Sequence, residues 1–493
     1  MAQTNYIAVD LGAESGRVMI GSVSDDKITL EEIHRFNNGP ITEGGSLRWD
    51  FAELMNNIKA GIAKAVKLAD SPIISIGVDS WGVDFGLIDE KGQLIENPYH
   101  YRDSRTNDTM EKAFELMPKR ELYENTGIQF MQFNTIYQLL SAKLANSAAL
   151  AKANKLIFMA DLVSFSLTGQ VYAEYSLAST SQLMDMKTGK WSKAVFEKLG
   201  LPLNIMPNIV APGTAVGKLT KNIADELGCG QIPVIAVGSH DTACAVAAVP
   251  ASASANNWMY LSSGTWSLMG IEVAKAIIND KSFEYQFTNE GGAENTIRFL
   301  KNIMGLWVVQ ECRRQWQREG TDLSYDQITE MTADAKPFKA YVDVDYDQFL
   351  SPGNMPEKIN AYLRQTGQET LSDKGEIVRS VLEGLAMKYC DVVDMIESLS
   401  QRKIDAVHIV GGGIKNEILC QFTANSLNKK VLTGPIEATA LGNIMLQAIA
   451  AGKIRNIAHG RELVRNSTPI KEYLPKDAAM WQKAVGKNRQ RQC

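Results

Sequence analysis

The chain has 493 residues, of which 45% are hydrophobic and 22% charged, as expected for a globular protein of two or three domains. Its 51 basic and 56 acidic residues give a net charge of −5, which favours neither nucleic acid nor an anionic membrane as a partner. The 6 scattered cysteines, the unclustered histidines and the lack of a signal peptide or long apolar run predict a cytoplasmic protein without disulfides, metal clusters or membrane spans.

The N-terminal part predicts strands around one long helix. Strand-like apolar runs occupy residues 6–9, 17–23, 27–36 and, after the helix, 73–78. The helix is expected to begin after Asp50, with Glu53 completing a capping box, because apolar residues then recur at helical spacing. Short runs at 85–88 and 93–95 flank the turn 89–92 and predict a hairpin.

The same pattern returns in the second half of the chain. A mostly helical insertion over 104–230 is followed by a strand at 233–237 and a helix at 242–249. The small, polar stretch 250–257 is interpreted as a linker and a hinge. Further elements are expected at 258–261, 266–271, 406–410, 416–427, 431–433 and 437–451. The recurrence favours two related halves over chance repetition of a common hairpin. Residues 452–493 predict a surface helix with a frayed tail.

Three glycine-bearing turns follow strand-like runs. They lie at 10–17 (DLGAESGR), 262–266 (SSGTW) and 410–416 (VGGGIKN). Glycine lets backbone N–H groups approach an anion, so each turn is a candidate phosphate cradle as well as an ordinary tight turn. A P-loop is excluded, because the nearest segment, 213–220, has one residue too few between its glycines and Leu219 in place of the Ser or Thr that binds magnesium. The dinucleotide fingerprint is also missing, since Asn416 stands where the last glycine is needed.

Asp241 lies between a predicted strand and a predicted helix, the kind of strand end where α/β proteins bind ligands. A carboxylate there suits the phosphorylation of a hydroxyl, because it accepts the proton as the alcohol oxygen attacks the γ-phosphoryl group. The neighbouring His240 and Thr242 can hydrogen-bond a polyol. The residues alone leave an N-cap role open for Asp241, and Asp10 is either a magnesium-associated carboxylate or a turn-forming residue.

At these motifs the sequence resembles the FGGY carbohydrate kinases of the actin-like ATPase superfamily, over roughly residues 5–455. Further marks of the resemblance lie at 33–38, 79–85, 101–106, 127–130, 167–169, 239–243, 260–270 and 301–307. The resemblance implies an α/β fold of two actin-like, ribonuclease H-like domains with a central cleft for ATP and sugar. It implies domains at 1–250 and 251–455, the second binding the nucleotide, and a helical tail at 456–493. It also implies Mg²⁺ and transfer to the 1-hydroxyl of L-rhamnulose in rhamnose catabolism.

The site residues are carried over from matching positions of the family. Asp241 matches the general base. Sugar-site positions match Gly82, His240, Asp241, Thr242 and Asn302. Nucleotide-site positions match Ala13, Glu14, Ser15, Gly16, Arg17, Thr265, Gln310 and Gly412. Asp10 is expected to serve the metal, directly or through water. Glu14 departs from the family, where a small hydroxyl residue is common, and its carboxylate is expected to point outward or toward the metal because a phosphate would repel it.

Other residues keep two interpretations. Trp81, Asp84 and Phe85 either shape the sugar pocket or pack into the core. Arg102, Asp103 and Arg105 either line the cleft or form a structural ion-pair network, and the network is favoured. Alternative functions are a kinase for L-fuculose or L-xylulose, a non-catalytic sugar or nucleotide sensor, and an actin-like chaperone ATPase. The expected partners are small molecules only, and the expected state is a monomer or a small homo-oligomer.

Overall fold

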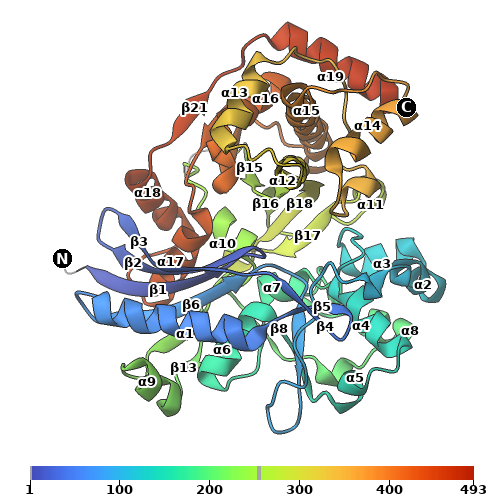
Figure 1. Ribbon diagram of the computed structural model, residues 1–493. Coiled ribbons are helices and arrows are strands. Elements are labelled where there is room, and N and C mark those ends of the chain that lie inside the picture. The colour runs from blue at the N-terminus through green and yellow to red at the C-terminus, as the bar shows by residue number, and fades with distance from the viewer. Residues whose placement is uncertain (1–2, 253–256, 493) are drawn as a thin grey trace. The chain divides into compact units, whose positions relative to one another are not determined.

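The computed structural model describes residues 3–252 and 257–492 and divides the chain into two compact units (Figure 1). Unit 1 comprises Met1–Ser252, Glu272–Phe299 and Ala438–Ser467, and unit 2 comprises Ala253–Ile271, Leu300–Glu437 and Thr468–Cys493. The predicted hinge at 250–257 includes residues 253–256, which lie outside the described residues.

Unit 1 is built on a 6-stranded sheet in the order β13-β14-β6-β1-β2-β3. Its strands are β1 (Thr4–Leu11), β2 (Ser15–Val23), β3 (Ile28–Asn37), β6 (Ile73–Ser80), β13 (Thr214–Lys218) and β14 (Pro233–Ala236). β1 pairs antiparallel with β2 and parallel with β6, and β6 pairs parallel with β14. The predicted N-terminal strands are confirmed, and the carboxyl ends of β1, β6 and β14 lie at one edge of the sheet.

Helix α1 (Phe51–Leu68) covers this sheet, packing on β2 and β3 (Figure 1). Its apolar stripe includes Leu54, Ile58 and Ile62, all buried. As predicted, Asp50 caps the helix, and its Oδ1 accepts a hydrogen bond from the Glu53 N–H at 3.0 Å. The Glu53 carboxylate itself accepts a bond from the Asn57 side-chain amide.

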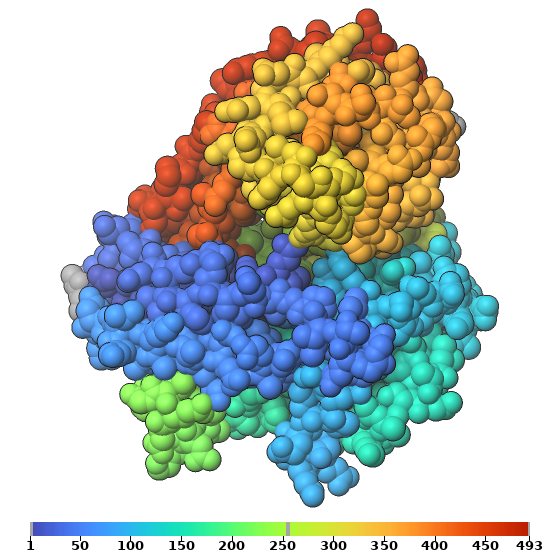
Figure 2. Space-filling view, in the orientation of Figure 1, coloured from blue at the N-terminus to red at the C-terminus, as the bar shows by residue number. Residues whose placement is uncertain are grey.

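The insertion between β6 and β14 is largely helical, as predicted. Its helices are η1 (Ser104–Thr106), α2 (Thr109–Leu116), α3 (Lys119–Thr126), α4 (Thr135–Leu144), α5 (Ala148–Lys152), α6 (Met159–Thr168), α7 (Tyr175–Ser179), α8 (Lys193–Leu199), η2 (Leu203–Ile205) and α9 (Lys221–Leu227). Short strand pairs accompany them: β9 (Ala173–Glu174) with β12 (Ile209–Val210), and β10 (Met184–Asp185) with β11 (Lys190–Trp191). A further pair, β4 (Pro40–Glu43) with β5 (Ser46–Trp49), lies before α1 in the chain. Figure 2 shows α9 as a green projection at the lower edge of this unit.

The hairpin expected around 89–92 is only partly right. The turn forms, with the Gly92 N–H donating to the Asp89 carbonyl. The segment 93–95 pairs with the strand before it through the Leu94–Ile88 bridge and through hydrogen bonds from the Asp89 N–H to the Gln93 carbonyl and from the Ile95 N–H to the Leu87 carbonyl, but it is too short to form a strand of its own. The strand partner of β7 (Phe85–Ile88) is instead β8 (Lys155–Phe158), which pairs antiparallel along its whole length. The buried run of β8 offers a complete ladder, whereas the three-residue run cannot.

Unit 2 repeats the strand order of unit 1. Its strands are β15 (Trp258–Ser263), β16 (Trp266–Val273), β18 (Ile297–Met304), β19 (Ala406–Val410), β20 (Lys430–Thr433) and β21 (Lys471–Tyr473), although the last two residues of β16 and the first three of β18 belong to unit 1. They follow the order β18-β16-β15-β19-β20-β21, with β15 antiparallel to β16, β19 parallel to both β15 and β20, and β21 antiparallel to β20. The strands β2-β1-β6-β14-β13 of unit 1 have the same order and the same relative directions as β16-β15-β19-β20-β21 of unit 2. The predicted relation between the halves is therefore confirmed.

The helices of unit 2 are α12 (Trp307–Arg318), α13 (Tyr325–Asp334), η4 (Asp347–Phe349), α14 (Met355–Gln365), α15 (Lys374–Ser400), η5 (Gly412–Lys415), α16 (Glu417–Leu427) and α19 (Ala478–Gln492). The expectation of a simple surface helix after residue 452 is wrong. The segment forms α18 (Ile457–Ser467), β21 and α19, and Trp481 of α19 is buried against Phe422 and Phe338. None of the helices in the described ranges combines the length and apolar character needed to cross a bilayer.

Unit 1 also contains α10 (Asp241–Ala247), α11 (Asp280–Glu284), β17 (Thr288–Gly291), η3 (Ala293–Asn295) and α17 (Ala438–Ala450). Helix α17 follows β20 in the sequence, yet it packs on β1, β6 and α10 of unit 1. Helices α17 and α10 approach each other very closely at Gly442. A Cβ added at this position would lie 1.9 Å from the Cys244 carbonyl oxygen.

We predict that Gly442→Ala destabilises the protein, because the methyl group meets backbone that cannot rotate away. Overpacking costs about 1–3 kcal/mol, and contact with backbone places the expected loss near 3 kcal/mol. Urea unfolding measures it. Gly230→Ala is the matched control in the same unit, since a Cβ there meets nothing within 4 Å. Equal unfolding midpoints for the two variants would contradict the close packing of α10 and α17.

Candidate functional site

Three aspartates gather at the carboxyl edge of the unit 1 sheet. Asp10 of β1 is in register with Asp79 of β6, and Asp241 begins α10 directly after β14. The loop before Asp241 is tied to β6, because the Ser80 N–H donates to the Ser239 carbonyl at 2.8 Å. Parallel pairing of β1, β6 and β14 therefore brings together carboxylates that are far apart in the sequence.

The first glycine-bearing turn is a β-hairpin closed on itself. The Gly12 N–H donates to the Ser15 carbonyl at 2.9 Å, and Asn38 donates to the Gly12 and Glu14 carbonyls. The Glu14 position is exposed. Gly16 has a packing role, because a Cβ there would lie 2.2 Å from the Phe36 ring. The need for glycine at this position is therefore explained by the neighbouring strand β3.

Asp10 and Arg17 form an ion pair across this hairpin, where they are register partners. The Arg17 guanidinium thus already faces a carboxylate. The pair keeps a negative and a positive group together at the end of β1, next to Asp79.

Asp79 was missed as a site residue by the sequence reasoning. It is fully buried, and its Oδ2 accepts a hydrogen bond from Asn443 Nδ2 of α17 at 2.6 Å. Burial, with a further contribution from the charge of Asp10, raises the pKa of the Asp79 carboxyl well above its usual value. The available signal was positional: Asp79 directly follows the predicted strand 73–78, much as Asp10 follows 6–9.

Asp241 is the most accessible of these three carboxylates, with about a third (33%) of its side chain exposed. Its Oδ1 accepts hydrogen bonds from the Thr242 N–H at 2.5 Å and from Thr242 Oγ1 at 3.0 Å. The N-cap interpretation is wrong, because His240 occupies the N-cap of α10 and Asp241 is its first helical residue.

The backbone before Asp241 is held by a buried carboxylate that the sequence reasoning also missed. Glu174 Oε2 accepts hydrogen bonds from the N–H groups of Ser239 and Leu177, both at 3.0 Å. Ser176 Oγ donates to the same carboxylate and accepts from the His240 N–H at 3.2 Å. Burial raises the pKa of Glu174, and these donors oppose the rise. The short helix α7 therefore fixes the position of the 239–241 loop.

The His240 ring lies among charged groups of unit 1. Its Nε2 is 3.4 Å from Asp241 Oδ1, and its Nδ1 is 3.1 Å from Arg298 Nη2. Glu290 Oε2 lies 3.4 Å from the same Nδ1 and 3.2 Å from Arg298 Nη2. Glu290 and Arg298 were not found by sequence reasoning, because their proximity to His240 depends on tertiary packing.

Near Gly82 the structure supports the packed-core interpretation. Trp81 and Phe85 are buried, and Asp84 accepts hydrogen bonds from both Trp81 Nε1 and Trp49 Nε1. Gly82 itself is partly exposed, and a Cβ there would lie 3.1 Å from Thr180 Oγ1. Asp84 thus organises buried indoles rather than facing a ligand.

Asp103 and Arg105 have structural roles, made by hydrogen bonds and a ring contact rather than by the expected ion pairs. Asp103 accepts hydrogen bonds from the N–H groups of Leu47 and Arg105, at 2.7 and 3.0 Å. The Arg105 guanidinium lies 3.6 Å over the Tyr99 ring and donates to Gln138.

In unit 2 the second and third glycine-bearing turns pack on each other. A Cβ at Gly413 would lie 2.1 Å from Ser263 Oγ, whereas Gly412 faces open space. The start of α12 secures the β15–β16 turn, because the Gly305 N–H donates to the Thr265 carbonyl at 3.1 Å. The structure thus brings the turns of Thr265 and Gly412 together.

Two further predicted residues of unit 2 lie on neighbouring elements. Gln310 is in the first turns of α12, and its side-chain Oε1 is buried without a hydrogen-bond partner among the described residues. Asn302 is a half-buried residue of β18.

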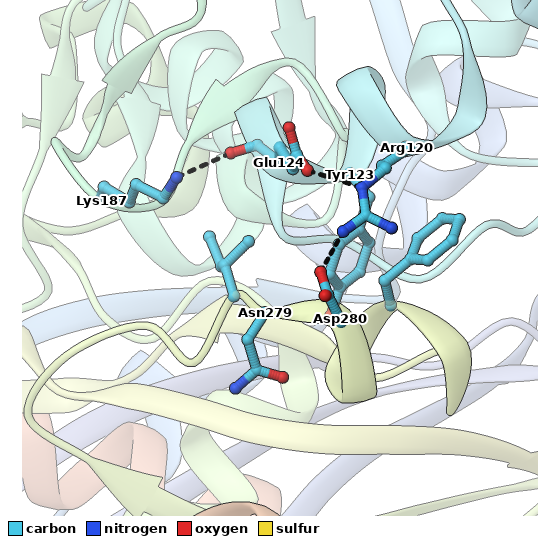
Figure 3. A pocket seen from close by; sticks show the side chains of 8 residues that line it. Arg120, Tyr123, Glu124, Lys187, Asn279 and Asp280 are labelled. Atoms are coloured by element: carbon cyan, nitrogen blue, oxygen red, sulfur yellow. Dashed lines mark hydrogen bonds and ion pairs between the residues drawn. The ribbon is translucent and has the colours of Figure 1, made fainter.

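A cavity of about 260 Å³ lies elsewhere in unit 1, between α3 and α11 (Figure 3). Figure 3 shows Arg120 directed at Asp280 and Glu124, with which it forms ion pairs, and Lys187 bonded to the Glu124 carbonyl. The charged groups that line this cavity already neutralise one another, and none of the predicted site residues lines the cavity.

Comparison with known proteins shows which proteins the chain is similar to. Residues 5–248 match the N-terminal domain, and residues 259–451 the C-terminal domain, of the FGGY family of carbohydrate kinases. A rhamnulokinase of Bacteroides thetaiotaomicron is 42% identical over 97% of this chain and 98% of its own. A rhamnulokinase of Bacillus subtilis is 39% identical over 96% of both chains. The crystal structure of gluconate kinase from Lactobacillus acidophilus shares the fold, with a TM-score of 0.82, 17% identity, and coverage of 99% of this chain and 97% of that one.

The Asp84 network generates a pH prediction. Burial raises the pKa of Asp84 to about 6 from 3.8, so the folded state keeps a proton that the unfolded state releases. Stability is therefore expected to fall as pH rises from 4 to above 6, by about 3 kcal/mol for a shift of about 2 pH units. Urea unfolding of the wild type and of Asp84→Asn, measured across this range, isolates the contribution because asparagine does not titrate. A stability difference that is independent of pH would contradict it.

Proposed function

Because the chain belongs to the FGGY family of carbohydrate kinases, we propose that it transfers the γ-phosphoryl group of ATP to the 1-hydroxyl of L-rhamnulose. The products are L-rhamnulose 1-phosphate and ADP. The observation that carries the choice of sugar is the full-length similarity to proteins named rhamnulokinase, at 42% and 39% identity. The solved sugar-kinase structures, below 20% identity, support the fold alone.

Asp241 is proposed as the general base. Its position at the carboxyl edge of the sheet and its partial exposure support this role, because a hydroxyl can reach the carboxylate. As the O1–H bond breaks, its proton passes to Asp241 while O1 forms a bond to the γ-phosphorus and the bond to ADP breaks. The Thr242 donors keep one carboxylate oxygen in place during this transfer.

The remaining predicted residues are proposed to contact the sugar or the nucleotide. The sugar contacts are proposed for Gly82, His240, Thr242 and Asn302, and the nucleotide contacts for Ala13, Glu14, Ser15, Gly16, Arg17, Thr265, Gln310 and Gly412. Gly412 suits close approach of a ligand, since nothing lies within 4 Å of the position a Cβ would take. The buried, unpartnered Gln310 Oε1 suits a donor group of the nucleotide.

Mg²⁺ is proposed as the metal, with Asp10 as its carboxylate. Among the residues that the structure describes, no group of three or more His, Cys, Asp or Glu side chains is arranged to hold a metal. This fits Mg²⁺, which usually takes one or two carboxylates and completes its shell with water and substrate phosphates. When bound, the ion supplies neutralisation of the phosphate charge.

The substrate assignment predicts the order of rates in a coupled assay of ADP release. L-Rhamnulose is expected to give a kcat/KM at least about 10-fold above L-fuculose and L-xylulose, the range a sugar pocket achieves through a few contacts. Without sugar, ADP release should stay near background. A higher rate with another ketose would overturn the sugar, and sugar-independent hydrolysis would favour the chaperone-like ATPase.

The base assignment predicts that Asp241→Asn lowers kcat by about 10²–10⁴-fold, the usual contribution of a general base. Asparagine retains an oxygen for the Thr242 donors, so sugar and ATP binding, measured by calorimetry, should persist. Asp225→Asn, on the exposed face of α9, is the matched control and should keep its activity. Unchanged phosphoryl transfer in Asp241→Asn would remove the base and favour a different proton acceptor.

A further inference from the structure

His240 is enclosed by charged groups on both of its ring nitrogens. On the Nδ1 side lie Arg298 Nη2 at 3.1 Å and Glu290 Oε2 at 3.4 Å, and on the Nε2 side lies Asp241 Oδ1 at 3.4 Å. Only 10% of the His240 side chain is exposed. The placement of its proton is therefore decided by these neighbours rather than by solvent.

The Arg298 contact determines which nitrogen is protonated. A guanidinium has donors and no acceptor, so a hydrogen bond between Arg298 Nη2 and His240 Nδ1 requires Nδ1 to accept. The Glu290 oxygen is farther from Nδ1 than a normal N–H···O bond allows. The remaining proton of the neutral ring must then be on Nε2, which faces Asp241.

Arg298 is itself held rigidly. Its side chain is fully buried, its Nε donates to the Gly291 carbonyl at 2.8 Å, and its Nη2 is paired with Glu290. The planar guanidinium therefore has its direction set by β17 on one side and presents an N–H to His240 on the other. The charge of Arg298 also acts on the phenol of Tyr175, whose pKa burial raises and the guanidinium lowers.

We propose that Arg298 and Glu290 are positioning residues that hold His240 as the neutral tautomer with the proton on Nε2. In this state His240 offers its Nε2–H as a donor beside Asp241, and its single lone pair is occupied by Arg298. His240 therefore cannot take the proton of a sugar hydroxyl, and Asp241 is left as the acceptor. The tautomer follows from the contacts alone, while its consequence for proton transfer rests on the proposed function.

The direct test is nitrogen NMR of the wild-type protein labelled with ¹⁵N-histidine, without substrate at pH 7. The chain has 5 histidines, and the His240 signals are assigned by their loss in His240→Gln. The expected spectrum shows a protonated Nε2 and an unprotonated Nδ1. A proton on Nδ1, or on both nitrogens, would overturn the proposal whether or not L-rhamnulose is the sugar.

Two variants separate positioning from a structural role. Arg298→Gln leaves His240 between two carboxylates, so Nδ1 should gain a proton as well, and the new positive charge beside Asp241 should lower kcat by about 10-fold. The KM for ATP should stay within about 2-fold. Glu290→Gln keeps Arg298 and should retain the neutral tautomer. An unchanged tautomer in folded Arg298→Gln would overturn the proposal; if that variant fails to fold, the wild-type spectrum decides.

Inactivity of the wild type on L-rhamnulose, together with the expected tautomer, would remove the proposed substrate and leave the positioning role of Arg298 intact. Activity on L-rhamnulose together with a different tautomer would overturn the positioning role of Arg298 and leave the proposed substrate intact.

Discussion

The parallel pairing of β1, β6 and β14 is the constraint on which the rest of unit 1 depends. Parallel strands end at the same edge of a sheet, so residues that follow each strand become neighbours without being close in sequence. Here this places Asp10, Asp79 and the Asp241 loop together, and the Ser80 to Ser239 hydrogen bond ties the last two strand ends directly. Burial and the nearby charge of Asp10 raise the pKa of Asp79, the hydrogen bond from the Asn443 amide opposes this rise, and Asp10 is paired with Arg17.

Buried carboxylates in this protein act as organisers of backbone and side chains. Glu174 gathers the N–H groups of α7 and of the 239–241 loop, and Asp84 gathers two indoles. A buried carboxylate without donors would cost several kcal/mol, so each of these groups forces its surroundings into one arrangement. The accessible carboxylate, Asp241, is thus surrounded by a frame that leaves it little freedom. Its position, more than its residue type, distinguishes it from the others.

The sequence predicted what depends on local pattern and missed what depends on tertiary contact. The strands and α1 follow from apolar runs and a cap, and the recurrence of strand-turn-strand anticipated the shared sheet order. The expected hairpin forms only as a short pairing of 93–95 with the end of β7, and the full partner of β7 is β8, which is distant in sequence. Asp241 stood out by its strand end and its flanking residues, whereas Glu174 and Arg298 have no local signal and acquire their roles only through contacts with the 239–241 loop and with His240. The close packing of Gly16 against Phe36 is a further tertiary contact without a local signal in the sequence.

The completion of unit 1 requires a segment from far along the chain. Helix α17 follows the strands of unit 2 in sequence, yet Asn443 supplies the donor to Asp79, and Gln447 donates to the Ile7 carbonyl and accepts from Ser75. Gly442 permits this by letting the helix backbone approach Cys244 of α10. The first 252 residues therefore contain all three aspartates but not the amide that satisfies the most buried one. Unit 1 can reach its complete arrangement only after the strands of unit 2 have been synthesised, so its site is a property of the whole chain rather than of its N-terminal half.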